Sequence, residues 1–492
     1  MKIKLFMAGV MTLAILTGCN ANIDEPTPVT ESEPKETSVG SDIATADEAS
    51  TVADKFMGRL SPGRSRAAYS DATTMQISDS CGNPLMYVIN YGNNNGFVIV
   101  SASKDYEPVL AYSDKGHFDI DIARKTGASI WLNAAETTIA SVDTISPDMK
   151  MFARIEWEKY LPQTKPATVA SQSSRANYNG YDIDAIKQAA FDEWYHNGWY
   201  VYTDTWIPGV PTHSPTAYPS EINWQLDEIR SDNSSFFMTG RPLIEDTYVV
   251  GWDETESKRV DPLMKTQWGQ QAPFNYYLQS IYPNSTYLGC TTVAVGQILR
   301  FREDLPGYDY YIMPDTRTSF GDMNYAGKFL YDIGRALKID YSNAKSGASL
   351  KTVKNALKKW GYSFEEKEFY QETLAMAVIY SKSPVYIRAS GRNDKTGEKN
   401  IGHAWVCDGA TYNRTTYYFY VMVPNPTPED AGTGPYKPWS WPAARKEHSY
   451  YSYHFNWGYY GEGDGFYSGS VFNIKDCIYY KDITILSNIK KN

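Results

Sequence analysis

Apolar residues in the first third of the chain follow two different spacings. After Thr45-Ala46-Asp47-Glu48, which has the sequence of a capping box, they recur every three or four positions and predict a helix. Short apolar runs bounded by turn residues predict strands. The predicted elements are a helix that starts after Thr45, a strand pair at 85–90 and 96–102, and a helix at 130–139. Together they predict a small α+β domain at residues 45–163, large enough to bury a core of its own.

The second half of the chain places helices before strands. Apolar spacing predicts helices at 290–299, 329–337, 350–360 and 373–380, and strand patterns follow at 385–389, 403–408, 415–423, 450–457 and 465–467. Helices followed by antiparallel strands are typical of an α+β fold. We therefore assign a second domain, with a helical part and an antiparallel sheet, to residues 257–492.

Residues 164–256 separate the two domains and are interpreted as a linker and an extension. Small and polar residues at 164–177 are typical of a linker, with Arg175 as one candidate for proteolytic nicking. A helix is predicted from Asp182 to Tyr195. No function is assigned to the remainder of this stretch.

The start of the chain has the pattern of a targeting segment. Lys2 and Lys4 precede an apolar run at 5–16 that is too short to span a bilayer. Leu16-Thr17-Gly18-Cys19 resembles a bacterial lipobox, which implies that residues 1–19 are a lipoprotein signal peptide and that Cys19 carries the lipid. A plain signal peptide with a chance cysteine is the alternative.

Residues 20–44 are rich in Pro, Thr, Ser and Glu and predict a disordered tether. We therefore expect an exported protein that is lipid-anchored to a bacterial membrane or cell surface, or released from it after processing. The lipid would be its only contact with the membrane.

Composition limits the partners of this protein. The 492 residues are 42% hydrophobic and 21% charged, as in globular proteins, and the net charge of −10 argues against a nucleic-acid partner. None of the five cysteines forms a CxxC pair or has the spacing of zinc ligands. We therefore expect neither a metal nor another cofactor.

Cys290 is the candidate nucleophile. It follows Gly289 and opens the predicted helix at 290–299. Unpaired N–H groups and the positive end of the helix dipole stabilise a thiolate at such a position and lower its pKa. A buried structural cysteine is the alternative. A catalytic thiolate also needs a base, a group that orients the base, and donors for the oxyanion.

Two histidines are candidates for the base. His403 begins an apolar strand between small residues that leave its ring accessible. His454 shares a strand face with Asn456, whose amide oxygen could accept a hydrogen bond from an imidazole N–H, and Trp457 could shield that bond from water. Spacing alone does not decide between the two histidines.

Gln270 is the candidate oxyanion donor. It lies in a loop with Trp268 and Gly269, ahead of the candidate nucleophile. Its side-chain amide could join the backbone N–H of Cys290 in an oxyanion hole. A solvated loop glutamine is the alternative.

These motifs in this order resemble the streptopain family of papain-like cysteine proteases, peptidase family C10. The similar segments are 261–270, 289–298, 384–409 and 456–466, within residues 260–472, and 87–88 with 96–102 are similar to the Spi-type inhibitory propeptide of that family. The resemblance implies that Cys290 is the nucleophile and that His403, not His454, is the base and later the acid. It also implies that Gln270 helps to form the oxyanion hole, and that Asn456 and Trp457 support the imidazole.

The resemblance implies a papain-like catalytic domain preceded by its own inhibitory propeptide. Such a zymogen cleaves protein or peptide substrates through an acyl-enzyme, with a preference for a hydrophobic side chain two residues before the cut. A transglutaminase-like acyltransferase and a non-catalytic surface lipoprotein that binds peptides or inhibits a protease remain alternatives. Two long stretches depart from the family pattern, 164–256 and 411–449. One hypothesis is that the second lies over the cleft and restricts substrates.

Overall fold

The computed structural model describes most of the chain after the targeting segment. The described residues are 42–60, 71–161, 183–203, 212–214, 217–231, 247–342, 347–392, 399–423, 439–472 and 483–492. The predictions for the signal peptide, for Cys19 and for nicking at Arg175 lie outside these residues. Ala44, which we assigned to the tether, is buried and donates its backbone N–H to Ala102 at 2.7 Å. In the described ranges no helix has the length and apolar character needed to cross a bilayer.

The N-terminal domain is a sheet covered by helices. Its elements are α1 (Ala46–Leu60), β1 (Thr73–Ser78), β2 (Pro84–Asn90), β3 (Phe97–Ser101), β4 (Val109–Ser113), α2 (Ile120–Ala123), α3 (Ala128–Ala140) and α4 (Pro147–Tyr160). The capping box is confirmed, because Glu48 N–H donates to Thr45 Oγ1 at 3.2 Å and Thr45 N–H donates to Glu48 Oε2 at 2.8 Å. The predicted hairpin is confirmed as the antiparallel pair β2 and β3.

The C-terminal domain combines helices with an antiparallel sheet, which confirms the predicted fold class. The helices are α7 (Tyr276–Ile281), α8 (Cys290–Arg302), α9 (Met323–Ala336), α10 (Leu350–Lys359) and α11 (Gln371–Ser381). The strands are β7 (Tyr248–Val260), β8 (Tyr362–Glu368), β9 (Val385–Arg392), β10 (Lys399–Val423), β11 (Trp439–Asn456), β12 (Gly465–Ser468) and β13 (Thr484–Lys491).

The strands predicted at 403–408 and 415–423 are one strand, β10. Its residues 411–414 continue the ladder because they pair with β11 on one side and with β7 on the other. The segment is rich in Thr and Tyr, which favour strands. Polar residues inside it mimic a turn in the sequence, but pairing on both sides keeps the chain extended.

One sheet runs through both domains. Its strand order is β1-β2-β3-β4-β12-β11-β10-β7-β5-β6, with β8, β9 and β13 branching from β10. The link between the domains is the antiparallel pair β4 and β12, in which Tyr112 lies opposite Phe466 and Ala111 opposite Tyr467. The sequence did not predict this continuity.

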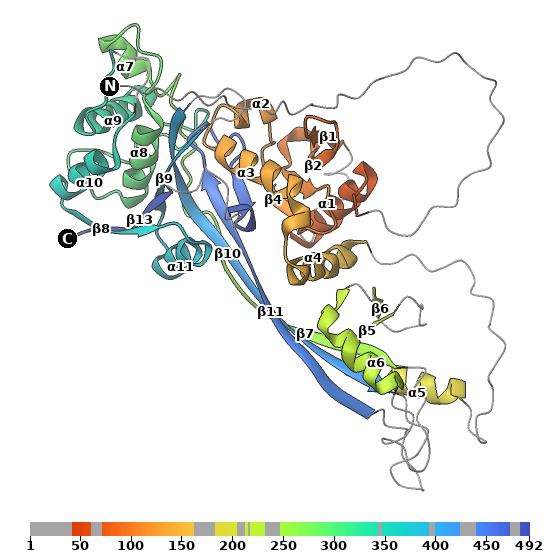
Figure 1. Ribbon diagram of the computed structural model, residues 1–492. Helices are drawn as coiled ribbons and strands as arrows, with labels where there is room; N and C mark the ends of the chain where they lie inside the picture. Colours follow the sequence, from red (N-terminus) through yellow and green to blue (C-terminus); the bar gives the residue numbers. More distant parts are fainter. Residues whose placement is uncertain are drawn as a thin grey trace, which may run out of the picture. The chain divides into compact units, whose positions relative to one another are not determined.

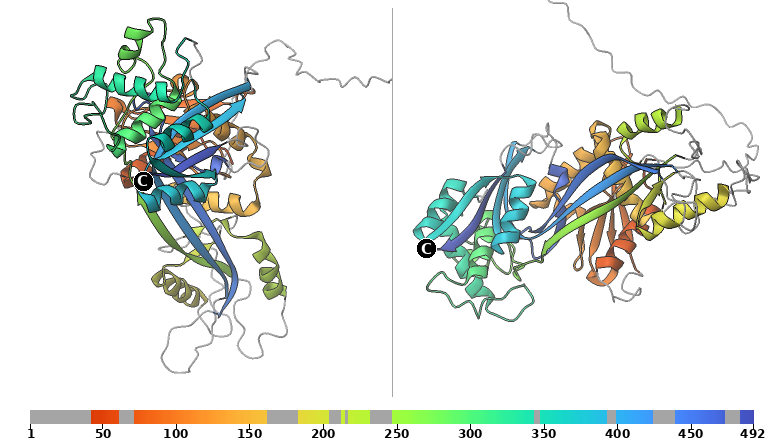
Figure 2. Two further views of the ribbon diagram at one scale, coloured as in Figure 1. Left: turned by 90° about the vertical axis from the view of Figure 1, so that its left-hand side faces the viewer. Right: turned by 90° about the horizontal axis from the view of Figure 1, so that it is seen from below.

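The described parts of residues 183–260 and 411–452 build an extension of the sheet, which we call the arm. The arm comprises β7 with residues 411–423 of β10 and 439–452 of β11, and these strands run away from α8 (Figures 1 and 2). At their far end the arm also includes α5 (Ile183–His196), β5 (Tyr200–Tyr202), β6 (Thr212–His213) and α6 (Asn223–Ser231). The helix predicted at 182–195 is confirmed as α5. Residues 411–423 and 439–449 lie in strands β10 and β11 of the arm, and the rest of the stretch that we expected over the cleft lies outside the described residues.

Candidate active site

The start of α8 places Cys290 as the sequence predicted. Gly289 precedes the helix with φ 91° and ψ 135°, a left-handed φ that favours glycine. All residues from Thr291 to Leu299 are buried, whereas Cys290 is only partly buried. A Cβ on Gly296 would lie 2.5 Å from Cδ2 of Leu330, so α8 and α9 pack closely there. The core therefore holds α8 firmly and leaves the thiol at its accessible end.

His403 meets this thiol from β10. It lies opposite Ala389 of β9 in the ladder, and its side chain lies close enough to Cys290 to lower the pKa of the thiol. Burial on its own would raise the pKa of the Cys290 thiol. The hydrogen bond and positive charge of His403, together with backbone contact from Ala404 and a side-chain bond from Thr291, outweigh burial, so the pKa of Cys290 lies below its ordinary value. This environment favours a thiolate.

The loop that carries Gln270 is attached to the segment just before Cys290. The Gln270 carbonyl accepts a hydrogen bond from Leu288 N–H at 2.9 Å. On its other side, Trp268 O accepts from Tyr460 N–H at 3.2 Å, and the Tyr460 hydroxyl accepts from Gln271 N–H at 2.9 Å. Main-chain hydrogen bonds therefore attach the Gln270 loop to Leu288, two residues before the helix starts at Cys290. Gln270 itself is half-buried.

Asn456 contacts other groups than the sequence predicted. Its side-chain oxygen accepts from Gln297 Nε2 at 2.9 Å and from Gly458 N–H at 3.1 Å, and its amide donates to Thr266 O at 2.7 Å. Within the described chain, no hydrogen bond joins Asn456 to His403. In this geometry Asn456 therefore does not orient the His403 imidazole directly.

Gln297 joins three segments of the site, and sequence reasoning gave it no role. Its side chain is fully buried two turns after Cys290. Its oxygen accepts from Trp268 N–H at 3.2 Å, and its amide donates to Asn456. Buried polar groups require partners, so a glutamine on an otherwise apolar helix was the signal that could have identified it.

Trp457 is held at both ends and lies against the N-terminal domain. Its backbone N–H donates to Asp464 Oδ1 at 2.9 Å and its indole N–H to Gly463 O at 3.2 Å. The ring centroids of Trp457 and Trp405 are 5.4 Å apart. A Cβ on Gly127, at the start of α3, would lie 3.0 Å from the Trp457 ring. The N-terminal domain thus contacts the residue that the resemblance places next to the imidazole.

His454 belongs to a separate buried pair. Its Nδ1 lies 2.6 Å from Asp408 Oδ1, and the other oxygen of Asp408 accepts from Met264 N–H at 2.9 Å. Both side chains are buried. The pair ties β11 to the start of the C-terminal domain, and the ring of His454 is bonded to a carboxylate rather than to the thiol.

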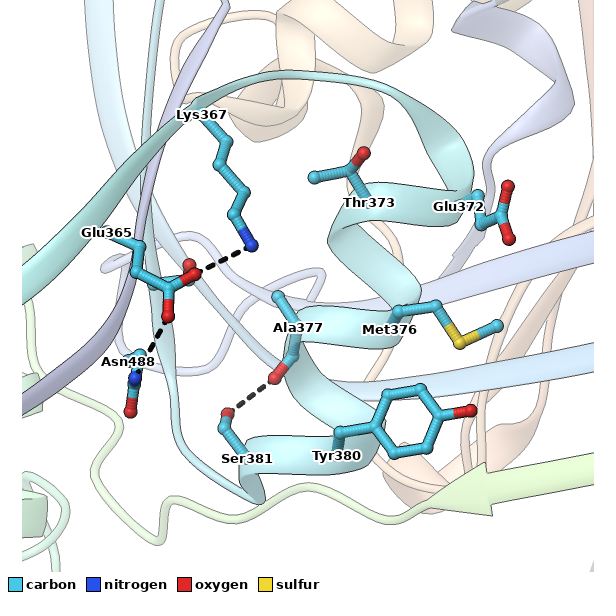
Figure 3. Close-up of a pocket in the computed structure, with 10 residues that line it drawn as sticks. Glu365, Lys367, Glu372, Thr373, Met376, Ala377, Tyr380, Ser381 and Asn488 are labelled. Atoms are coloured by element: carbon cyan, nitrogen blue, oxygen red, sulfur yellow. Dashed lines mark hydrogen bonds and ion pairs between the residues drawn. The ribbon is translucent and has the colours of Figure 1, made fainter.

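The remaining polar features carry no catalytic candidate. Cys407 is buried, and burial raises the pKa of its thiol well above the ordinary value. The described residues contain no group of three His, Cys, Asp or Glu side chains that could hold a metal ion. A pocket of about 660 Å³ between α11 and β8 holds Lys367, which points to Glu365, and Asn488, which donates to that same carboxylate at 3.1 Å (Figure 3). Lys367 and Glu365 pair with each other at 2.7 Å, and Glu372 points away from them.

Family models match two regions of the chain. The model described as Spi protease inhibitor matches residues 28–139, and that of the Peptidase C10 family matches residues 302–467. The second range contains His403, Asn456 and Trp457 but begins after Gln270 and Cys290. The assignment of the thiol therefore rests on its position and contacts.

Solved structures resemble the chain only remotely, and no curated protein matches it. A fragment of prointerpain A from Prevotella intermedia is 15% identical with a TM-score of 0.41, over 84% of this chain and 98% of that chain. Active interpain A from the same organism, a cysteine protease, is 17% identical with a TM-score of 0.31, over 46% of this chain and 94% of that chain. Both TM-scores are too low to transfer the role of a residue.

Proposed function

This chain is a streptopain-like cysteine peptidase of family C10 with a Spi-type propeptide, and we propose that it is an exported endopeptidase whose thiol is Cys290. The observation that carries the proposal is the place of Cys290 at the N-terminus of α8 together with the influence of His403 of β10, which lowers the pKa of the thiol. A thiol whose pKa is lowered by an imidazole is the nucleophile that acyl transfer requires.

In the proposed reaction, the Cys290 thiolate attacks the carbonyl carbon of a peptide bond while His403 is protonated. The carbonyl oxygen becomes an oxyanion that accepts hydrogen bonds from Cys290 N–H and the Gln270 amide. His403 then gives its proton to the amine as the C–N bond breaks, which leaves a thioester on Cys290. A water molecule, deprotonated by His403, attacks the thioester and releases the acid and the thiol.

Asn456 acts in this proposal through Gln297 rather than on the imidazole. The Gln297 side chain bonds both to Asn456 and to the backbone of Trp268, two residues before Gln270. This network supports a fixed spacing between α8, the oxyanion loop and the end of β11. Trp457 supplies an apolar wall held by Asp464.

The N-terminal domain is proposed to keep the site inactive until the connection between the domains is cut. Contact of Gly127 with the Trp457 ring and the pairing of β4 with β12 support this role. Lipid anchoring through Cys19 remains a proposal from the sequence. Membrane fractionation of cells that produce wild type or Cys19→Ala tests it, because only the wild type should sediment with membranes.

Replacement of the thiol tests the proposed reaction. Cys290→Ala should abolish casein hydrolysis and self-processing while the chain stays folded. A thiol-directed irreversible inhibitor should inactivate the wild type and label Cys290. Cys81→Ala is the matched control, because Cys81 is an exposed cysteine of the N-terminal domain, and it should keep full activity. Hydrolysis by the Cys290→Ala variant would refute the assignment, and amide transfer to an added amine would favour the acyltransferase.

A further inference from the structure

Helix α4 of the propeptide takes part in two separate cores. Trp157 and Tyr160 pack with α1 and the propeptide strands. Met151, Phe152 and Ile155 pack instead with residues of the arm. The helix therefore has one apolar face for its own domain and a second for the arm. An amphipathic surface helix needs only the first of these faces.

The arm presents an aromatic and aliphatic surface to α4, which we call the α4-binding surface. Its main apolar residues are Tyr202, Ile222, Leu226, Val249, Tyr417 and Phe419. Phe152 lies at its centre, with its ring 5.2 Å from that of Tyr417 and 4.6 Å from that of His448, nearly parallel to both. Phe152 and Tyr417 are both buried, so this contact is desolvated on each side.

Polar contacts with the arm hold both ends of the helix. Near its N-terminus, Asp148 pairs with Lys446 of β11 at 2.9 Å. Near its C-terminus, Glu158 bonds to the ring of His213 and accepts from Ser214 N–H at 3.1 Å. The two acids are ten residues apart, or about 15 Å along the helix. The surface thus fits an amphipathic helix with an acid at each end and an aromatic ring between them.

The residues of this surface stay with the peptidase when the domains are separated. All of them follow Ile183 in the chain, whereas α4 ends at Tyr160. A cut in residues 162–182 would break the covalent connection and leave every contact of α4 in place. Ring stacking, apolar burial, the ion pair of Asp148 with Lys446 and the hydrogen bonds of Glu158 would then act between two chains.

We propose that the α4-binding surface binds the propeptide as a separate chain, so that the propeptide remains bound after the linker is cut. The proposal rests on the zymogen function proposed above. Cutting the linker is then insufficient for activation, and release of α4 from the arm is a distinct later step.

The test uses the full chain with a site for a specific protease inserted in residues 165–175 and with Cys290→Ala, so that no self-cleavage occurs. After cutting, both fragments should elute together on size exclusion. Phe152→Ala should speed release of the propeptide on dilution by at least about 30-fold, because buried aromatic residues at the centre of an interface carry most of the affinity and act mainly on dissociation. Lys159→Ala is the control on the same helix, since its amine bonds to Glu156 within α4. It should change release less than about twofold.

A double-mutant cycle shows whether the effect comes from the contact itself. Tyr417→Ala should also speed release, and the double variant should gain less than the product of the two single effects, because the two rings touch. Immediate separation of the cut wild-type chain would overturn the proposal, and so would release unchanged by Phe152→Ala or fully multiplicative effects. Release is measured without catalysis, so a failure of the proposed peptidase activity would appear separately, as absent hydrolysis by the cut chain that retains Cys290.

Discussion

Glu107 of the propeptide provides a test of how pH acts on the zymogen. Glu107 is partly buried where the two domains meet, and its carboxylate accepts hydrogen bonds from the hydroxyls of Ser468 and Ser470. The Tyr106 hydroxyl donates to Ser470 Oγ at 2.7 Å beside it. Burial raises the pKa of Glu107 to about 7, against the two serine bonds, which lower it, and with a smaller rise from the charge of Glu156.

The direction in which pH changes propeptide binding depends on the state, assembled or separated, in which Glu107 binds its proton more tightly. Its pKa is about 7 in the assembled protein and has a reference value of 4.5. The protonated carboxyl therefore favours the assembled state below about pH 4.5, and this contribution is lost as the pH rises through about 7. The gap corresponds to about 3 kcal/mol, or about 300-fold in propeptide affinity. This value is an upper bound, because the separated propeptide keeps part of the burial.

The assay follows propeptide release from the cut Cys290→Ala chain between about pH 5 and about pH 8. Wild-type release should accelerate with pH, by at most about 300-fold, whereas Glu107→Gln should remove most of this dependence because the amide stays neutral. Burial also raises the pKa of Asp464 to about 7, so a residual slope common to both proteins is expected.

Removing the Ser470 hydroxyl tests whether the pH dependence of release shifts in the expected direction. The hydroxyl of Ser470 lowers the pKa of Glu107, so Ser470→Ala should shift the acceleration to higher pH. The reasoning is refuted if Glu107→Gln keeps the full wild-type pH dependence, or if Ser470→Ala moves the midpoint to lower pH.

Two further substitutions test the positioning of the site. Gln297→Met leaves the Trp268 N–H without its buried acceptor. The free energy of unfolding in denaturant titrations should therefore fall by about 1–3 kcal/mol, and kcat should fall more than KM rises. Unchanged stability and kcat would contradict the network. Gly269→Ala would place a Cβ 2.2 Å from Cε1 of Tyr460, so the oxyanion loop should shift and kcat should drop by about 10²-fold or more. Gly347→Ala, where nothing lies within 4 Å, should leave kcat unchanged.

Local signals in the sequence were sufficient to predict most of the elements. The capping box of Thr45 and Glu48 acts within one turn, and the start of α8 at Cys290 follows from glycine before an apolar helical run. Long-range pairing has no such signature. The pairing of Tyr112 with Phe466 joins residues more than 350 positions apart, and the continuity of β10 depends on neighbours that its own sequence does not contain.

The candidate site also combines residues that local sequence signals identified with contacts that they did not. The sequence brought Cys290 and His403 forward as partners, and in the structure His403 lowers the pKa of the Cys290 thiol. The support of the imidazole by Asn456, which the resemblance implied, stays a prediction. The amide of Asn456 is satisfied by Gln297 and Thr266, which lie on elements far away in sequence. Such choices depend on packing between elements and cannot be deduced from local spacing.

The continuous sheet gives a physical reason why inhibition and the site are coupled. Strand β12 pairs with β4 of the propeptide, and it begins directly after Asp464, which holds the backbone of Trp457. It ends at Ser468, which donates to Glu107. Departure of the propeptide therefore removes a ladder partner and a buried carboxylate from one short strand, and exposes its edge. Because the same strand is anchored beside Trp457, we expect propeptide release to act on the wall of the proposed active site directly, through the backbone.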